Sequence, residues 1–243
     1  MVSKKKKWLA IQQDNTPVPF NPSQITTTLW LDSTDSSTLT DDGAGLISQW
    51  RDKSGNNNHA NGVTTGRPTL TLAVQNGLNV LRFSPPNSLE IVNRLTLTGE
   101  YTIFTVLSRR VITGTRIFIG DSLTDAKLGH TVPSTQRFFA RSLSAGSNDQ
   151  TIVYPTAINV FGLISVQRDA SNKVDYQFNN TSAVRLYADA SQSGTTGVRR
   201  IGNDNAGTAG WNGDIAEVIV IDGNVSSALK TQINNYLITK YNL

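Results

Sequence analysis

The chain has 243 residues, and its hydrophobic fraction of 37% and charged fraction of 16% are typical of a folded, water-soluble domain. It has no cysteine, which excludes disulfide frameworks, thiolate metal sites and cysteine nucleophiles, and its two histidines exclude a zinc site built from several imidazoles. Four of the 22 basic residues are consecutive lysines near the start, so the rest of the chain carries 18 basic against 18 acidic residues. This even balance disfavours nucleic acid as the main ligand.

The first 24 residues differ in composition from the rest and predict an extended N-terminal arm (1–24). A lysine run and a short apolar patch are followed by three prolines spaced through polar residues. The patch is too short for the core of a signal peptide, and no later window is long enough to span a membrane. The arm is either a solvated tail or a docking segment. We favour docking on a partner, through Lys4, Lys5, Lys6, Lys7, Trp8, Leu9 and Ile11.

From residue 25 onward, short β-type runs alternate with turn residues. Val174, Tyr176 and Phe178 alternate with polar residues, which is the period of a half-buried strand, and the turn residues at 179–182 predict a hairpin. The spacing of such runs predicts an all-β, two-sheet antiparallel sandwich over residues 25–243. We expect strands over Thr28–Leu31, Leu78–Phe83, Tyr101–Leu107, Arg116–Ile119, Arg137–Ala140, Val160–Val166, Val174–Phe178, Val184–Tyr187 and Asp214–Ile221.

One helix is predicted, at the C-terminal end of the chain. Ser226 is suited to be its N-cap, and the apolar residues that follow recur at the spacing of a single helical face. We expect this helix to pack on the edge of the sandwich. Its apolar stripe consists of Leu229, Ile233, Tyr236, Leu237 and Tyr241.

Two segments carry a family resemblance. The first is Trp50–Gly55 with Asn76–Phe83, and the second, which is more specific, is Trp211–Asp222 followed by a helix that closes on Lys240 and Tyr241. Together they resemble the LamG-like jelly-roll domains of the concanavalin A-like lectin/glucanase superfamily. The resemblance implies a jelly-roll sandwich with ligand-binding loops. Because the superfamily includes lectins, glucanases, adhesion modules and tailed-phage structural proteins, the fold alone does not settle the function.

The acidic residues argue against an enzyme. The glucanases of this superfamily place Glu, Asp and Glu at alternating positions of one strand, which puts all three carboxylates on one face. This chain has three glutamates in total, and no two of them are close in sequence. Around Glu217, the neighbours expected on the same face are Ile215 and Ile219. We therefore predict a protein that is not an enzyme.

Other catalytic arrangements stay open but have little support. An aspartate set assembled from Asp32, Asp52 and Asp214 requires that separate loops converge. Neither His59 nor His130 lies in a nucleophile-elbow context, and both are expected to be loop histidines. The run at 121–125 offers two carboxylates but lacks the spacing of a calcium loop. We predict no metal ligand and no required cofactor.

Two polar loops supply candidate glycan-binding residues, because sugar hydroxyls are recognised by amides, carboxylates and aromatic rings. Loops rich in Asn, Asp and Gly also have the composition of ordinary turns. In particular, Trp50 and Asp52 also fit a core aromatic residue and a carboxylate that braces a loop. The candidates are Asp52, Asn57, His59, Asn203, Asp204 and Trp211.

Taken together, these features favour a non-catalytic virion structural protein, either a capsid decoration protein or a tail or fibre module. Its arm would bind other virion proteins and its sandwich would face outward. Its location would be the virion, after synthesis in the host cytoplasm. The alternatives are a lectin or adhesion module that binds cell-surface polysaccharide and, ranked third, a glycoside hydrolase.

Overall fold

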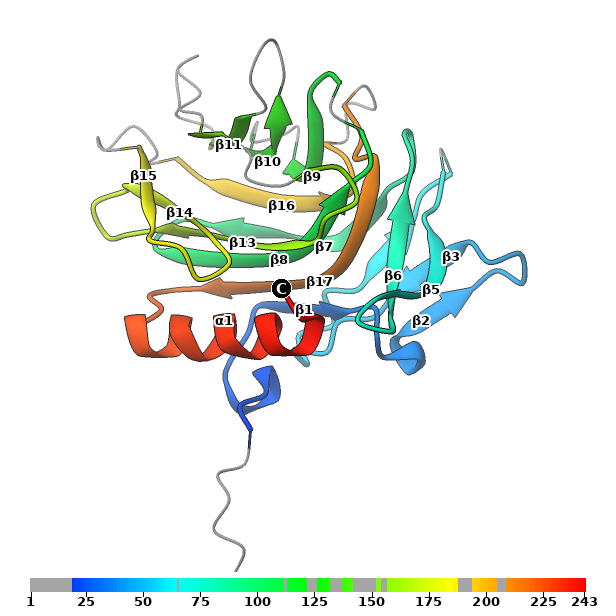
Figure 1. The fold of residues 1–243 in the computed structure, drawn as a ribbon, viewed down its shortest axis with the longest axis horizontal. Coiled ribbons are helices and arrows are strands. Elements are labelled where there is room, and N and C mark those ends of the chain that lie inside the picture. Colours follow the sequence, from blue (N-terminus) through cyan, green and yellow to red (C-terminus); the bar gives the residue numbers. More distant parts are fainter. Residues whose placement is uncertain are drawn as a thin grey trace, which may run out of the picture.

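The computed structural model of the protein describes residues 19–64, 66–111, 113–121, 126–131, 137–141, 152–153, 157–187, 194–204 and 209–243. Within these ranges, two antiparallel sheets stack face to face and one helix covers the outside of one sheet (Figure 1). The expected all-β sandwich with a C-terminal helix is therefore confirmed. The predicted docking residues of the arm, numbers 4 to 11, lie outside the described residues.

Sheet A contains eight described strands in the order β15-β14-β13-β8-β17-β6-β5, with β1 also pairing with β17. Every residue of β8 is buried, as is every residue of β17 except the last, because the second sheet covers one face and the helix covers the other. The strands of sheet A are β1 (Leu29–Asp32), β5 (Thr69–Gln75), β6 (Leu78–Phe83), β8 (Tyr101–Arg109), β13 (Gly162–Arg168), β14 (Val174–Phe178), β15 (Val184–Tyr187) and β17 (Gly213–Asp222).

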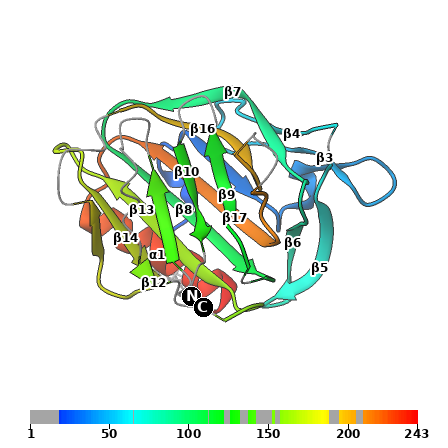
Figure 2. The ribbon, with the colours of Figure 1, turned by 90° about the horizontal axis from the view of Figure 1, so that it is seen from above.

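Sheet B contains nine described strands in the order β12-β11-β10-β9-β16-β7-β4-β3-β2. From above, β9, β10 and β16 lie over β8 and β17 of sheet A (Figure 2). The core between the sheets includes Trp50, Phe83, Phe118 and Trp211. The strands of sheet B are β2 (Leu39–Asp41), β3 (Ile47–Trp50), β4 (Ala60–Gly62), β7 (Leu89–Leu97), β9 (Arg116–Asp121), β10 (Ala126–Thr131), β11 (Arg137–Arg141), β12 (Ile152–Val153) and β16 (Thr196–Ile201).

The helix α1 (Ser227–Tyr241) begins where the sequence predicts. The Ser226 hydroxyl accepts a hydrogen bond from Leu229 N at 3.2 Å, which satisfies one free donor of the first turn. The helix packs on the outer face of sheet A rather than on an edge, because β8 and β17 present apolar residues such as Val106 and Ile221 on that face. A second hydrophobic core, between sheet A and α1, includes Phe104, Ile219 and Ile233.

The chain enters the fold beside α1. Residues Pro22–Gln24 form a 3-10 turn, η1, because Asn21 caps its start and Gln24 bonds back to the Asn21 backbone. The last part of the arm is therefore folded rather than extended. The Phe20 ring meets the Tyr236 ring edge to face, with 6.3 Å between the ring centroids. No helix in the described ranges combines the length and apolarity needed to cross a membrane.

Candidate functional site

The loop that carries Asp52 is held together by its own side chains. The Asp52 carboxylate accepts hydrogen bonds from the backbone N–H groups of Trp30, Ser54 and Asn58, at 2.9 to 3.0 Å. The Asp52 backbone N–H in turn donates to His59 Nδ1 at 3.1 Å. Asp52 thus braces the loop against β1. Of the two roles considered from the sequence, glycan binding and bracing of the loop, the structure shows the bracing.

Trp211 does not offer a platform for a sugar ring. Its side chain is 0% exposed, and its ring lies edge to face against Phe118 and His130, with centroid separations of 5.4 and 5.5 Å. Asn203 and Asp204 are each 3% exposed. The candidate role of Trp211 in stacking is corrected, because the residue belongs to the core between the sheets.

The two predicted loops do not come together. The Asp52 loop contacts Trp30, which pairs with Ile219 near the far end of β17, whereas Trp211 precedes the first residue of that strand. Of the candidates, Asn57 is exposed, at a φ of 59°. His130 is also corrected: it is fully buried in β10 rather than in a loop. Its burial and the nearby arginine charges lower its pKa to about 4.

Glu217 lies at the centre of a buried polar cluster between β17 and α1. Its carboxylate accepts hydrogen bonds from Trp30 Nε1 at 2.7 Å, Lys240 Nζ at 2.8 Å, Tyr241 OH at 2.9 Å and Tyr236 OH at 3.3 Å. Burial raises the pKa of Glu217 above its ordinary value, and the neighbouring Asp32 charge adds to this effect. We call this the Glu217 cluster.

The sequence places Ile215 on the same face as Glu217, and this expectation is wrong. A β-bulge between Ile215 and Glu217 shifts the register of β17 against β8. Ile215 consequently faces the core between the sheets, whereas Ile219 shares the helix side with Glu217.

Asp32 completes the Glu217 cluster but leaves no room for a substrate. Lys240 Nζ bridges the two carboxylates, at 2.9 Å from Asp32 and 2.8 Å from Glu217, and their side chains are 5% and 1% exposed. Burial alone would raise the pKa of Asp32, but the charges of Lys240 and Lys53 and the Thr34 hydroxyl together lower it. The cluster joins α1 to sheet A through Lys240, and its two carboxylates are not open to a substrate.

The three aspartates that the sequence left open do not converge. Asp32 belongs to the Glu217 cluster, Asp52 braces its loop, and Asp214 forms an ion pair with Arg82 at 2.7 Å. Within the described ranges, no group of three or more His, Asp or Glu side chains is arranged to hold a metal ion. Arg199 and Arg200, the adjacent arginines of β16, both form ion pairs with Glu90 at 2.8 Å.

A polar hollow of about 530 Å³ lies between α1 and the strands β13 and β14. Asn234 on its floor is 2% exposed, and its Nδ2 donates to Gln177 Oε1 at 3.3 Å. Gln177 Nε2 donates to Thr181 O, which leaves Gln177 Oε1 as the acceptor for Asn234. The Asn234 amide therefore turns its Nδ2 toward Gln177 and its Oδ1 away from it. Asn234 Oδ1 is left as a buried acceptor to which no described residue donates. The lining includes Gln167, Asp175, Gln177, Ser227, Lys230 and Asn234.

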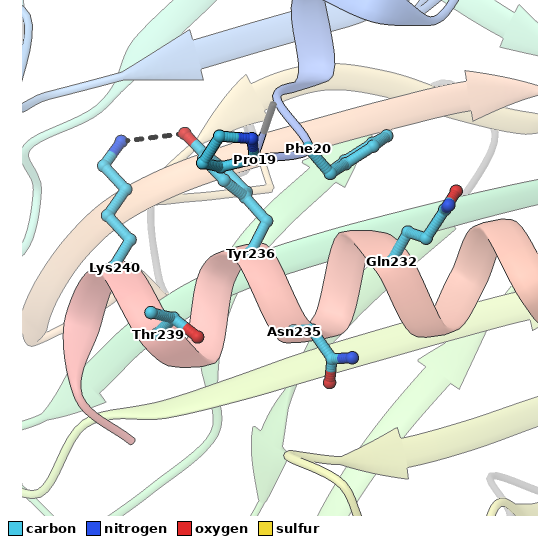
Figure 3. A pocket seen from close by; sticks show the side chains of 7 residues that line it. All are labelled: Pro19, Phe20, Gln232, Asn235, Tyr236, Thr239 and Lys240. Atoms are coloured by element: carbon cyan, nitrogen blue, oxygen red, sulfur yellow. Dashed lines mark hydrogen bonds between the residues drawn. The ribbon is translucent and has the colours of Figure 1, made fainter. Parts of the chain in front are cut away.

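A second hollow, of about 410 Å³, lies on the other side of α1, at the point where the N-terminal segment reaches the helix. Figure 3 shows Pro19 and Phe20 over Tyr236, with Lys240 bonded to the Tyr236 hydroxyl at 3.2 Å. Most of its lining surface is apolar. We call it the apolar hollow.

Sequence reasoning missed the polar hollow completely. Its residues come from β13, β14 and α1, and Gln167 and Asn234 are far apart in the sequence. The one signal was the set of amide and hydroxyl residues on the polar face of the predicted helix, which is also the composition of an ordinary solvated face.

No family model matches the chain, and no curated protein matches it. Similar solved structures exist, and three of them illustrate their range. An arabinofuranosidase complexed with arabinofuranosyl-α-1,2-xylobiose is 15% identical with a TM-score of 0.59, covering 81% of this chain and 51% of that one. The enzymatically active domain of bacteriophage CBA120 tailspike protein 2 is 21% identical with a TM-score of 0.50, covering 76% and 30%.

The third is a structure of botulinum neurotoxin type C, whose cell entry depends on two ganglioside molecules. It is 12% identical with a TM-score of 0.54, covering 87% of this chain and 51% of that one. The chain thus spans about half or less of the length of these proteins. The shared feature is the fold: this chain is a two-sheet β-sandwich like the domains that it matches in these proteins.

Proposed function

We propose that this chain is a non-catalytic glycan-binding module and that the polar hollow is its sugar site. The observation that carries the proposal is Asn234 Oδ1, a buried acceptor without a donor on the floor of a hollow lined by amide and hydroxyl side chains. Leaving a buried acceptor unpaired costs about 1 to 3 kcal/mol. A sugar hydroxyl recovers that free energy if the Asn234 side chain turns this oxygen, which has almost no accessible surface, toward the hollow.

The chemistry of the lining fits sugar recognition. Gln167, Gln177 and Asn234 supply amide groups that both donate and accept, as the hydroxyls of a saccharide require. Proteins with a similar fold also support glycan binding, since they include an arabinofuranosidase in complex with a saccharide and a neurotoxin whose cell entry depends on gangliosides. Asp175 is the only described carboxylate of the lining, and the nearby Asp169 is held by the same Arg185 that pairs with Asp175, so binding without hydrolysis is the function we favour.

The test is a glycan array probed with the full-length protein and three variants. We expect Asn234→Ala and Gln177→Ala to lose binding, while Asn57→Gly in the Asp52 loop keeps it. Because Asn234→Ala also removes the Nδ2 hydrogen bond to Gln177 Oε1, the melting temperature of each variant is measured beside its binding, to separate lost binding from lost folding. Retained binding in Asn234→Ala together with lost binding in Asn57→Gly would move the site to the loop that the sequence indicated.

A second candidate function is display of the sandwich on a virion, within the LamG-like branch that the sequence resembles. It is favoured by the apolar hollow, which lies where the N-terminal arm joins α1, and by the fold shared with a phage tailspike domain. In this account the arm binds other virion proteins and the polar hollow faces outward toward cell-surface polysaccharide.

The test compares two proteins, the full-length chain and a chain that lacks residues 1–18. Each is cosedimented with phage capsids or tails. The truncation stops before Phe20, because that ring packs on Tyr236 and its removal would disturb α1. We expect attachment of the full-length protein only. Equal attachment of both proteins, or of neither, would remove the arm as an anchor.

A further inference from the structure

We propose that the polar hollow selects acidic saccharides: a sugar carboxylate binds at the Lys230 ammonium, at the end of the hollow where α1 begins, while a ring hydroxyl of the same ligand donates to Asn234. This inference rests on the proposed glycan-binding function and specifies the chemical class of its ligand. It concerns carboxylate-bearing sugars of either the uronic or the sialic type, because both present the same group.

Lys230 is a half-buried cation without a matching anion. Its Nζ has one weak contact, with Gln167 Oε1 at 3.5 Å, and no carboxylate of the described residues lies within ion-pair distance of it. Burial lowers the pKa of Lys230, and the charge of Asp175 opposes that shift only in part. A cation that has lost part of its water and gained no ion pair is poised to bind an anion.

The start of α1 adds to the preference for negative charge. Ser227, the first residue of this 15-residue helix, lines the hollow, and no acidic residue occupies the first turn. The free backbone N–H groups at a helix start and the helix dipole both favour an anion. Two turns further along, Asn234 Oδ1 is a second polar group of the lining for which no described residue supplies a partner.

The spacing of the two contacts suits one sugar unit. Lys230 and Asn234 are four residues apart on the same helix face, which separates their backbones by about 6 Å along the axis. A pyranose ring with a carboxylate at one end and a hydroxyl at the other spans a gap of this size.

One acidic side chain faces the same hollow and has to be accounted for. Asp175 belongs to the lining, and Arg185 Nε contacts its Oδ1 at 2.7 Å, but the same guanidinium also pairs with Asp169 at 3.0 Å, so it offsets the Asp175 charge only in part. The repulsion that Asp175 exerts on an incoming carboxylate is correspondingly weakened. Lys230 is the cation of the lining that forms no ion pair with a described residue, and Asp175 is the anion with which an incoming carboxylate competes.

The experiment compares acidic saccharides with the same compounds after reduction of each carboxylate to an alcohol. Sialyllactose, tetragalacturonate and a hyaluronan tetrasaccharide are titrated into the full-length protein by calorimetry, beside their reduced forms and lactose. We expect at least one acidic compound to bind about tenfold tighter than its reduced form, which corresponds to about 1.4 kcal/mol. Lys230→Gln should abolish this preference, and Lys230→Arg should retain it.

Lys173→Gln is the matched control, because it removes a lysine charge outside the hollow and should retain the preference. Equal affinity for the acidic and reduced forms would overturn the inference while leaving glycan binding intact. So would an unchanged preference in Lys230→Gln. If no saccharide binds in any form, including lactose and the array glycans, the proposed function fails and the inference fails with it.

Discussion

Removing the charge of Lys240 should destabilise the protein strongly, and more so at high pH. Lys240 Nζ lies 2.9 Å from Asp32 and 2.8 Å from Glu217, and these two residues are direct partners in the pairing of β1 with β17. In Lys240→Met the apolar stem still covers the aromatic rings of α1, but two buried carboxylates face each other without their shared cation. Breaking a buried ion pair on one side costs about 3 to 5 kcal/mol.

The two carboxylates keep other hydrogen bonds and ion pairs, so we expect the loss in free energy of unfolding to lie near the lower end of this range, at about 3 kcal/mol at pH 8. Asp32 keeps its contact with Lys53, and Glu217 keeps the hydrogen bonds from Trp30 and Tyr241. The variant relieves the repulsion by protonating Glu217, whose pKa in the folded state then rises further above its value in the unfolded chain. A group with a raised folded pKa loses stability as the pH rises, by about 1.4 kcal/mol per pH unit.

Urea unfolding at pH 5 and pH 8, followed by tryptophan fluorescence, measures this effect. We expect the loss in free energy of unfolding, relative to the original chain, to be at least about 1.4 kcal/mol smaller at pH 5 than at pH 8. Lys173→Met controls for the removal of a lysine charge elsewhere. An equal loss at both pH values, or a loss below about 1 kcal/mol, would refute the role given to the Glu217 cluster.

Three further outcomes follow from the same structure. Because the pKa of His130 is lowered to about 4 in the fold, the unfolded chain binds this proton first, so stability should fall as the pH drops from 6.5 to 4. His130→Phe should remove this contribution, of at most about 3 kcal/mol, in unfolding measured across that range. Gly213→Ala places a Cβ against the backbone carbonyl of Ser108 and should lower the melting temperature markedly. Trp30→Phe deletes the donor to Glu217 and should cost about 1.5 to 3 kcal/mol in urea unfolding, whereas an unchanged midpoint would contradict that bond.

Much of the fold was predictable because its signals are local. The strands β6, β14 and β15 coincide with their predicted ranges, and Ser226 caps α1 as expected. Each depends on a short apolar run, an alternating pattern or a capping side chain, all of which can be read within about ten residues. The bulge in β17 has no such signal, since it depends on pairing with a strand more than a hundred residues away.

The candidate site was less predictable because burial and long-range contact decide it. Trp211 and Asn203 have the composition of a sugar-binding loop, yet they lie in the core, and only the packing of sheet B over sheet A reveals this. The polar hollow joins Gln177 of β14 to Asn234 of α1, a contact set by the tertiary structure alone. An orphaned acceptor such as Asn234 Oδ1 is visible only after every partner has been placed.

The central claim is that a saccharide occupies the polar hollow, and NMR of the side-chain amide groups tests it most directly. Sialyllactose, tetragalacturonate and the hyaluronan tetrasaccharide are each added to the isotope-labelled protein. With at least one of them, we expect the largest shifts at the side-chain NH₂ resonances of Asn234 and Gln177 and at the backbone of the first turn of α1. Shifts centred on the Asp52 loop, or no shifts with any of the three, would contradict the placement of the site.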